Sequence, residues 1–173
     1  ISILLFVFIP LVIGIPECDL DKYEIIEDVS GSGGQSTIKL IRAVDPTEKR
    51  EGEGKATIPI DSKVAVMKIY NKRQEYLREL EVLSNLNHPN IIKPICRSAN
   101  RRYNSHFIVF PFYKEGTLDT VDYGLSDKQM VMISAQIVSA VWYLHKVGFT
   151  HQDIKPANIL LDDSLNAILI DFA

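Results

Sequence analysis

The chain has 173 residues, of which 46% are hydrophobic and 24% are charged, and its formal net charge at pH 7 is −3. This is the composition of an ordinary globular domain, and the slightly negative charge excludes any electrostatic reason to expect a nucleic-acid partner. The two cysteines, Cys18 and Cys96, form neither a disulfide framework nor a metal-ligand spacing. We expect Cys96 to be a buried small residue, because its neighbours are apolar.

Residues 1–15 are almost wholly apolar, interrupted only by Ser2, Pro10 and Gly14. The run is shorter than the roughly 20 residues that span a membrane. It is typical of the hydrophobic part of a signal peptide, although no basic segment precedes it. The tail of a longer transmembrane helix and a translated upstream sequence are the alternatives. We predict a signal peptide or membrane anchor over residues 1–18, and therefore membrane association or the secretory pathway, with a cytoplasmic location as the alternative.

A glycine-rich turn follows the first predicted strand, residues 23–29. Small residues let backbone N–H groups approach phosphate oxygens closely. Taken alone, such a turn is equally consistent with an ordinary hairpin. The candidates for contact with a phosphate-bearing ligand are Gly31, Ser32, Gly33, Gly34, Ser36 and Ile38.

A polar loop over residues 45–62 leads to an apolar strand, residues 64–70, which contains one cation, Lys68. A lysine buried in such a strand is costly without a partner, so Lys68 either faces solvent or meets an anion. The next helix, predicted over residues 74–86, supplies that anion.

The apolar face of this helix consists of Tyr76, Leu80 and Leu83, and Glu79 shares the face because it lies three or four residues from its neighbours. We therefore predict that Glu79 pairs with Lys68. The other two acidic residues of the helix, Glu75 and Glu81, fall off the stripe.

Two strands are predicted next, over residues 91–96 and 107–110, and a helix over residues 126–146. Ser126 and Gln129 have the spacing of a capping box at its start, and Gly148 suits the position after its end. The apolar stripe of this helix consists of Met130, Ile133, Ile137, Val141 and Leu144.

The last 23 residues combine polar side chains in a pattern suited to phosphoryl transfer. That reaction needs a carboxylate near the attacking hydroxyl, oxygen ligands for magnesium and a cation near the transferred phosphate. Asp153 and Lys155 supply the carboxylate and the cation. Asn158, together with Asp171 at the end of the apolar run 167–170, supplies the oxygen ligands.

These motifs, in this order, resemble the eukaryotic protein kinases over residues 23–173. The spacing from Asp153 to Asn158 matches H-R-D-x-x-x-x-N, and Asp171 and Phe172 match the first two residues of D-F-G. The resemblance implies an α+β, two-lobed protein-kinase-like fold with a partial kinase domain over residues 21–173. Its small antiparallel-sheet lobe with the ATP site would comprise residues 21–112, and residues 113–173 would begin the helical large lobe with the catalytic loop.

The same resemblance implies an ATP- and Mg²⁺-dependent phosphorylation of Ser or Thr on protein substrates. Asp153 would accept the hydroxyl proton, and Lys155, the residue that favours Ser/Thr over Tyr, would neutralise phosphoryl charge. Lys68 would contact the ATP phosphates, while Asn158 and Asp171 would hold Mg²⁺. In the hinge, the implied adenine contacts are Phe110 at the back of the pocket, the Pro111 C=O and the Tyr113 N–H.

Several positions depart from the family pattern: Ser36 replaces the third glycine, Ile38 a valine, Gln152 an arginine and Ala173 the last glycine. Gln152 cannot pair with a phosphate on an activation segment as arginine does. The sequence of the hinge is most similar to the Numb-associated and Golgi-linked Ser/Thr kinase branch.

Relatives in this family continue beyond the D-F-G position, so we expect either a fragment of a longer protein or a truncated product. On its own, the chain would bind nucleotide poorly and phosphorylate nothing. The alternative function is an inactive ATP-binding pseudokinase or scaffold.

Overall fold

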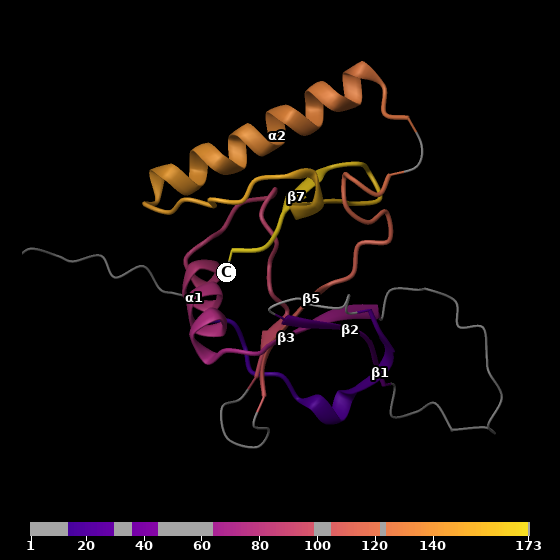
Figure 1. The fold of residues 1–173 in the computed structure, drawn as a ribbon, viewed down its shortest axis with the longest axis vertical. Coiled ribbons are helices and arrows are strands. Elements are labelled where there is room, and N and C mark those ends of the chain that lie inside the picture. The colour runs from indigo at the N-terminus through magenta and orange to yellow at the C-terminus, as the bar shows by residue number, and fades with distance from the viewer. Residues whose placement is uncertain (1–13, 30–35, 45–63, 99–104, 122–123, 173) are drawn as a thin grey trace, which may run out of the picture.

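The computed structural model describes residues 14–29, 36–44, 64–98, 105–121 and 124–172. A five-stranded antiparallel sheet with helix α1 beside it forms one end of the molecule, and helix α2 forms the other (Figure 1). A two-stranded hairpin lies between the two ends. This arrangement confirms the predicted α+β fold, an antiparallel-sheet lobe followed by the first elements of a helical lobe.

The large sheet has the spatial order β1-β2-β3-β5-β4, and all neighbouring strands are antiparallel. Ile38, Lys68 and Ile108 lie side by side across its three central strands. The strands are β1 (Tyr23–Asp28), β2 (Ser36–Ala43), β3 (Val64–Tyr70), β4 (Cys96–Arg97) and β5 (His106–Pro111).

Both faces of β3 are covered, which explains its nearly continuous apolar sequence. Ala65 and Met67 belong to a cluster on one face that includes Phe107 and Cys96. Tyr70 belongs to the main core, on the opposite face. Because successive side chains of a strand point to opposite faces, Lys68 lies on the same side as Tyr70.

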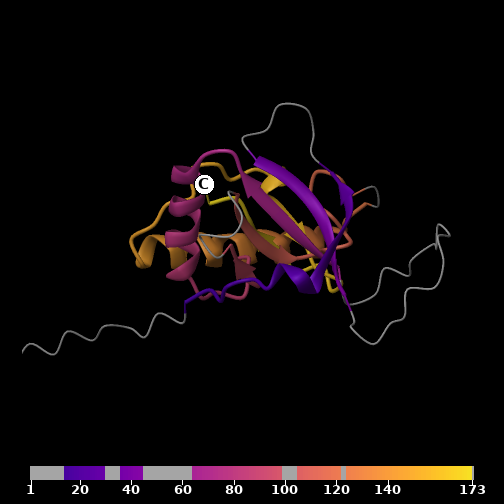
Figure 2. The ribbon, with the colours of Figure 1, turned by 90° about the horizontal axis from the view of Figure 1, so that it is seen from below.

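Helix α1 (Arg73–Ser84) stands beside the sheet, as Figure 2 also shows. Its buried residues are Tyr76, Glu79 and Leu83, which recur at the spacing of one helical turn. The predicted inward position of Glu79 is therefore confirmed. Glu81 is exposed, and Glu75 pairs instead with Lys72 at 3.1 Å.

Helix α2 (Asp127–Lys146) begins with the predicted capping box, in which Ser126 and Gln129 satisfy each other's backbone N–H groups. It ends in a Schellman motif, with Gly148 at φ +87° and the Phe149 N–H donating to the Leu144 carbonyl at 2.9 Å. The predicted stripe is partly wrong. Met130 is 43% exposed, whereas Ala140, which we did not place on the stripe, is fully buried.

The strand predicted over residues 91–96 is also wrong for most of its length. The strand β4 that pairs with β5 consists of Cys96 and Arg97, and the Ile95 N–H before it donates to the Val109 carbonyl of β5 at 2.8 Å. Ile92 turns away instead, and its N–H donates to the Leu169 carbonyl at 3.0 Å, while the Leu169 N–H donates to the Asn90 carbonyl at 2.9 Å. These bonds tie the segment after α1 to the hairpin β6 (Ile159–Leu161) and β7 (Ala167–Leu169).

Cys18 and Cys96 form a disulfide bond with each other, which corrects the expectation that they have no pairing role. Cys96 is buried, as predicted. The residues around Cys18 follow β4: the Cys18 N–H donates to the Arg97 carbonyl at 2.8 Å, and the Arg97 N–H donates to the Pro16 carbonyl at 2.9 Å.

This segment before β1, the indigo trace that passes α1 in Figures 1 and 2, belongs to the folded domain. Ile15 is buried in the main core. The described fold therefore begins earlier than residue 21, where we expected it. Within the described ranges, no helix is both long enough and apolar enough to cross a membrane.

Candidate active site

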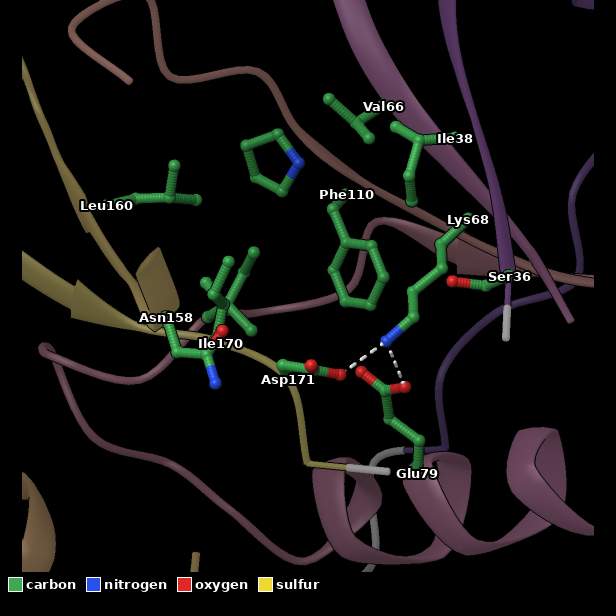
Figure 3. Close-up of a pocket in the computed structure, with 12 residues that line it drawn as sticks. Ser36, Ile38, Val66, Lys68, Glu79, Phe110, Asn158, Leu160, Ile170 and Asp171 are labelled. Carbon is green, nitrogen blue, oxygen red and sulfur yellow. Dashed lines mark hydrogen bonds and ion pairs between the residues drawn. The ribbon is translucent and has the colours of Figure 1, made fainter. Parts of the chain in front are cut away.

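Lys68 of β3 is held between two carboxylates that come from distant parts of the chain. Its Nζ lies 2.7 Å from Glu79 Oε2 on α1 and 2.8 Å from Asp171 Oδ1, just after β7 (Figure 3). Glu79 is 1% exposed. The lysine strand, the helix and the residues after the hairpin therefore meet at one point, and the predicted pairing of Lys68 with Glu79 is confirmed.

The charge of Lys68 is set by opposing effects. Burial disfavours the ammonium, but the carboxylates of Glu79 and Asp171 outweigh it and raise the pKa of Lys68 above its ordinary value. Lys68 is therefore a fixed cation. An ammonium has three N–H donors, and two of them serve these carboxylates, so one remains for a further anion.

A cavity of about 300 Å³ opens beside this cluster. That volume lies at the lower end of the range for small-molecule sites. Figure 3 shows Ile38 and Val66 on the sheet side of the cavity and Leu160 on the opposite side, with the charged cluster at one end. The cavity thus offers apolar walls for a planar ring and a polar end for an anionic group. The lining residues are Ser36, Ile38, Val66, Lys68, Glu79, Ile92, Phe110, Pro111, Asn158, Leu160, Ile170 and Asp171.

Asp153 lies in the loop after α2 and is held by two neighbours. Lys155 Nζ donates to its Oδ2 at 2.7 Å, and Asn158 Nδ2 donates to the same oxygen at 2.9 Å. The hydrogen bond from Lys155 is the main reason that the pKa of Asp153 lies below its ordinary value. Asp153 is a solvent-accessible carboxylate that stays ionised, which suits it to accept a proton from a hydroxyl group.

Asn158 and Asp171 are brought together by the hairpin. Asn158 ends the short 3₁₀ turn η2 (Pro156–Asn158), and its carbonyl accepts the Ile170 N–H at 3.0 Å. Asp171 has φ +67°, a left-handed conformation that is uncommon for a residue other than glycine, and its carboxylate faces Lys68. Both residues line the cavity.

Comparison with known proteins identifies the family to which a site of this geometry belongs. The protein kinase domain family matches residues 33–173. The chain belongs to the protein kinase family. A probable serine/threonine-protein kinase of Dictyostelium discoideum, samkB, is 32% identical over 167 residues, which cover 91% of this chain and 26% of the relative.

Serine/threonine-protein kinase RAD53 of Saccharomyces cerevisiae is 32% identical over 87% of this chain and 18% of its own length. Human NUAK family SNF1-like kinase 1 is 40% identical over 55% of this chain and 14% of its own length. The chain therefore spans about a quarter or less of these relatives. The similarity to the Numb-associated and Golgi-linked Ser/Thr kinase branch stays a prediction.

Not all predicted site residues of the kinase domain lie where we expected them. Ser36, Ile38, Phe110 and Pro111 line the cavity. Tyr113 lies instead at a second cavity of about 280 Å³, beside Phe112 and Asp162. Its role as an adenine hydrogen-bond donor stays a prediction. The four residues of the predicted glycine-rich turn, Gly31, Ser32, Gly33 and Gly34, and also Ala173, lie outside the described residues.

One residue of the kinase site that we did not single out from the sequence is His151. Its Nδ1 accepts the Asp153 N–H at 3.3 Å, so its Nε2 carries the hydrogen and donates to the Ile170 carbonyl at 2.8 Å. Its ring also lies edge-on to Phe172, with 4.8 Å between ring centroids. His151 thereby fixes the distance between the Asp153 loop and the residues before Asp171. Its place directly before Gln152 and Asp153 was the available signal.

Proposed function

We propose that this domain transfers the γ-phosphoryl group of ATP to a Ser or Thr hydroxyl of a protein substrate. The observation that carries the proposal is the meeting of Lys68, Glu79 and Asp171 within 2.8 Å at one end of an apolar cavity. Phosphoryl transfer depends on positioning and charge stabilisation, and a lysine held in place as a cation by two carboxylates can supply both.

Each residue has a distinct part in this proposal. Lys68 offers its remaining N–H donor to the phosphate chain of ATP. The apolar walls around Phe110 hold the adenine ring. Asp153 orients the substrate hydroxyl and takes its proton. Lys155, which is hydrogen-bonded to Asp153, neutralises charge on the transferred phosphoryl group.

The residues present fit a magnesium ion that is shared with the nucleotide. Within the part of the chain that the structure describes, no group of three or more His, Cys, Asp or Glu forms a metal cage. Mg²⁺ bound with nucleotides needs only one or two protein oxygen ligands, because phosphates and waters supply the rest. Asn158 and Asp171 would hold it, and when bound it neutralises charge on the phosphates.

The preference for Ser or Thr over Tyr rests on Lys155, two residues after Asp153, and on the names of the relatives, which are serine/threonine-protein kinases. A scaffold that binds ATP without transferring phosphate is the alternative. The two are separated by Asp153→Asn, which keeps the shape of the side chain and removes its basicity.

The test is transfer of radiolabelled phosphate from MgATP to casein by the protein that carries this domain. We expect Asp153→Asn to lower kcat at least about 100-fold, the usual contribution of a general base. Its affinity for MgATP, measured by fluorescence of an ATP analogue, should stay within about twofold of the wild type, because Asp153 does not line the cavity. A wild-type protein that binds MgATP and labels no acceptor would refute the kinase proposal.

We also propose that the domain matures in the secretory pathway. Two observations support this: the disulfide between Cys18 and Cys96, and the apolar sequence of residues 1–15. Disulfide bonds persist in oxidising compartments and are rare in the cytosol. Alkylation of thiols at the moment of cell lysis, followed by mass measurement, tests the location. We expect neither cysteine to react before reduction, and full alkylation of both would count against it.

A further inference from the structure

Tyr70 is a buried residue at the end of β3 with no role in the kinase pattern described so far. It follows Lys68 by two residues, so both side chains project from the same face of the strand. The Tyr70 hydroxyl donates to Glu79 Oε2 at 2.7 Å, and this is the same oxygen that accepts from Lys68 Nζ at 2.7 Å. One carboxylate oxygen is thus shared by two donors from one strand.

The charge of Glu79 needs this second donor. A fully buried carboxylate is costly unless its lone pairs are hydrogen-bonded. The Lys68 ammonium donates one hydrogen bond to Glu79 and one to Asp171, and a phosphate would accept the third. Burial and the nearby Glu79 carboxylate raise the pKa of Tyr70 far above its ordinary value, so its hydroxyl keeps its proton and remains a donor.

Tyr70 also belongs to a ring cluster that docks α1 on the sheet. Its ring lies edge-on to Tyr76 of α1, with centroids 5.7 Å apart, and Tyr76 stacks on His106 of β5 at 5.2 Å. His106 pairs with Tyr70 in the sheet register. Tyr76 precedes Glu79 by one helical turn, so the cluster sets the height and rotation of the helix at the point where Glu79 reaches Lys68.

We propose that Tyr70 is a positioning residue for phosphoryl transfer. Its hydroxyl holds Glu79 in place and carries part of the negative charge, so that Lys68 stays aimed at the polar end of the cavity with one donor free for a phosphate. This inference rests on the proposed kinase function, because the anion that Lys68 meets there is taken to be a nucleotide phosphate.

The test compares Tyr70→Phe with Tyr76→Phe in the protein that carries this domain. Both variants delete one hydroxyl from the same ring cluster. Among the described residues, the hydrogen bond of the Tyr76 hydroxyl goes to the Ser98 carbonyl at 3.5 Å and not to Glu79. We expect Tyr70→Phe to raise the Kd for a fluorescent MgATP analogue about tenfold, since hydrogen bonds to charged groups are the strong ones. Tyr76→Phe should remain within about twofold of the wild type.

A double-mutant cycle separates positioning from plain stability. In a Lys68→Ala background, Tyr70→Phe should cause no further change in Kd, because the hydroxyl acts through Lys68. The melting temperatures of both single variants show whether each is folded at the temperature of the binding assay. Equal fold-changes for Tyr70→Phe in the two backgrounds, or an unchanged Kd in the single variant, would overturn the role of Tyr70.

The outcomes also separate this inference from the kinase proposal. A wild-type protein that binds MgATP without labelling any acceptor overturns the proposed catalysis, while the Kd values still decide the role of Tyr70. A wild-type protein that binds no MgATP overturns both. Catalysis that is normal in Tyr70→Phe, in both KM for ATP and kcat, overturns the positioning role and leaves the kinase function in place.

Discussion

Reduction of the disulfide between Cys18 and Cys96 is expected to destabilise the domain by several kcal/mol. The two residues are 78 positions apart in the chain, so the bond closes a long loop and removes many conformations from the unfolded state. The chain-entropy relation gives about 4.5 kcal/mol for a loop of this length. Measured values usually fall below this limit, and we expect a loss of about 2–4 kcal/mol.

The folded protein retains part of the connection after reduction. Two backbone hydrogen bonds join residues 16–18 to Arg97, and Glu17 lies 3.7 Å from the Arg97 guanidinium. These contacts should keep the segment before β1 beside β4 after reduction. We therefore expect the folded structure to persist and its free energy of unfolding to decrease. For a domain of this size, the expected loss corresponds to a decrease in Tm of about 5–15 °C.

The assay is urea unfolding of the protein with and without a phosphine reductant. The matched control is the double variant Cys18→Ala/Cys96→Ala, which should unfold at the same urea concentration under both conditions. Intact mass after alkylation confirms the thiol state of each sample. An oxidised wild-type protein that unfolds at the same urea concentration as its reduced form would refute the reasoning from loop closure.

Three further changes test individual contacts. Lys155→Ala is expected to move the acid limb of the pH–rate profile to higher pH: the Lys155 hydrogen bond holds the pKa of Asp153 low, so without it the carboxylate protonates sooner as pH falls. An unmoved limb in kcat measured from about pH 3 to pH 8 counts against Asp153 as the base. Glu79→Leu should cost about 3–5 kcal/mol of unfolding free energy in urea, because it breaks a buried ion pair, whereas the exposed Glu81→Leu should change it by less than about 0.5 kcal/mol. Gly148→Ala should cost about 1 kcal/mol through its left-handed φ alone, since an added Cβ meets nothing within 4 Å; Gly124→Ala, equally open but outside that backbone region, is the control, and equal losses for the two would contradict this account.

Much of the site could be predicted because its residues are read from local spacing. The helical period placed Glu79, and not Glu75 or Glu81, on the inner face of α1. The capping box at Ser126 and the glycine after α2 also depend only on neighbours within a few residues. The five-residue interval from Asp153 to Asn158 similarly corresponds to a short loop in which their side chains contact each other.

Two predictions were wrong because they depend on which other part of the fold covers an apolar segment. Residues 91–96 have the apolar character of a strand, yet Ile92 donates its N–H to β7, and the strand that pairs with β5 is only Cys96 and Arg97. Met130 fits the helical stripe of α2, yet its side chain is 43% exposed. Periodicity identifies the apolar face of an element and carries no information about how much of that face is covered.

The sequence by itself determined the order of the motifs, the family and the identity of the charged residues, because each depends on short intervals along the chain. Only the tertiary structure decided that Cys18 meets Cys96, that Tyr70 shares an oxygen of Glu79 with Lys68, and that His151 spans the gap to Ile170. These contacts depend on the register between strands and on the rotation of α1 against the sheet. Both are set by the packing of many side chains at once, and no short interval in the sequence records them.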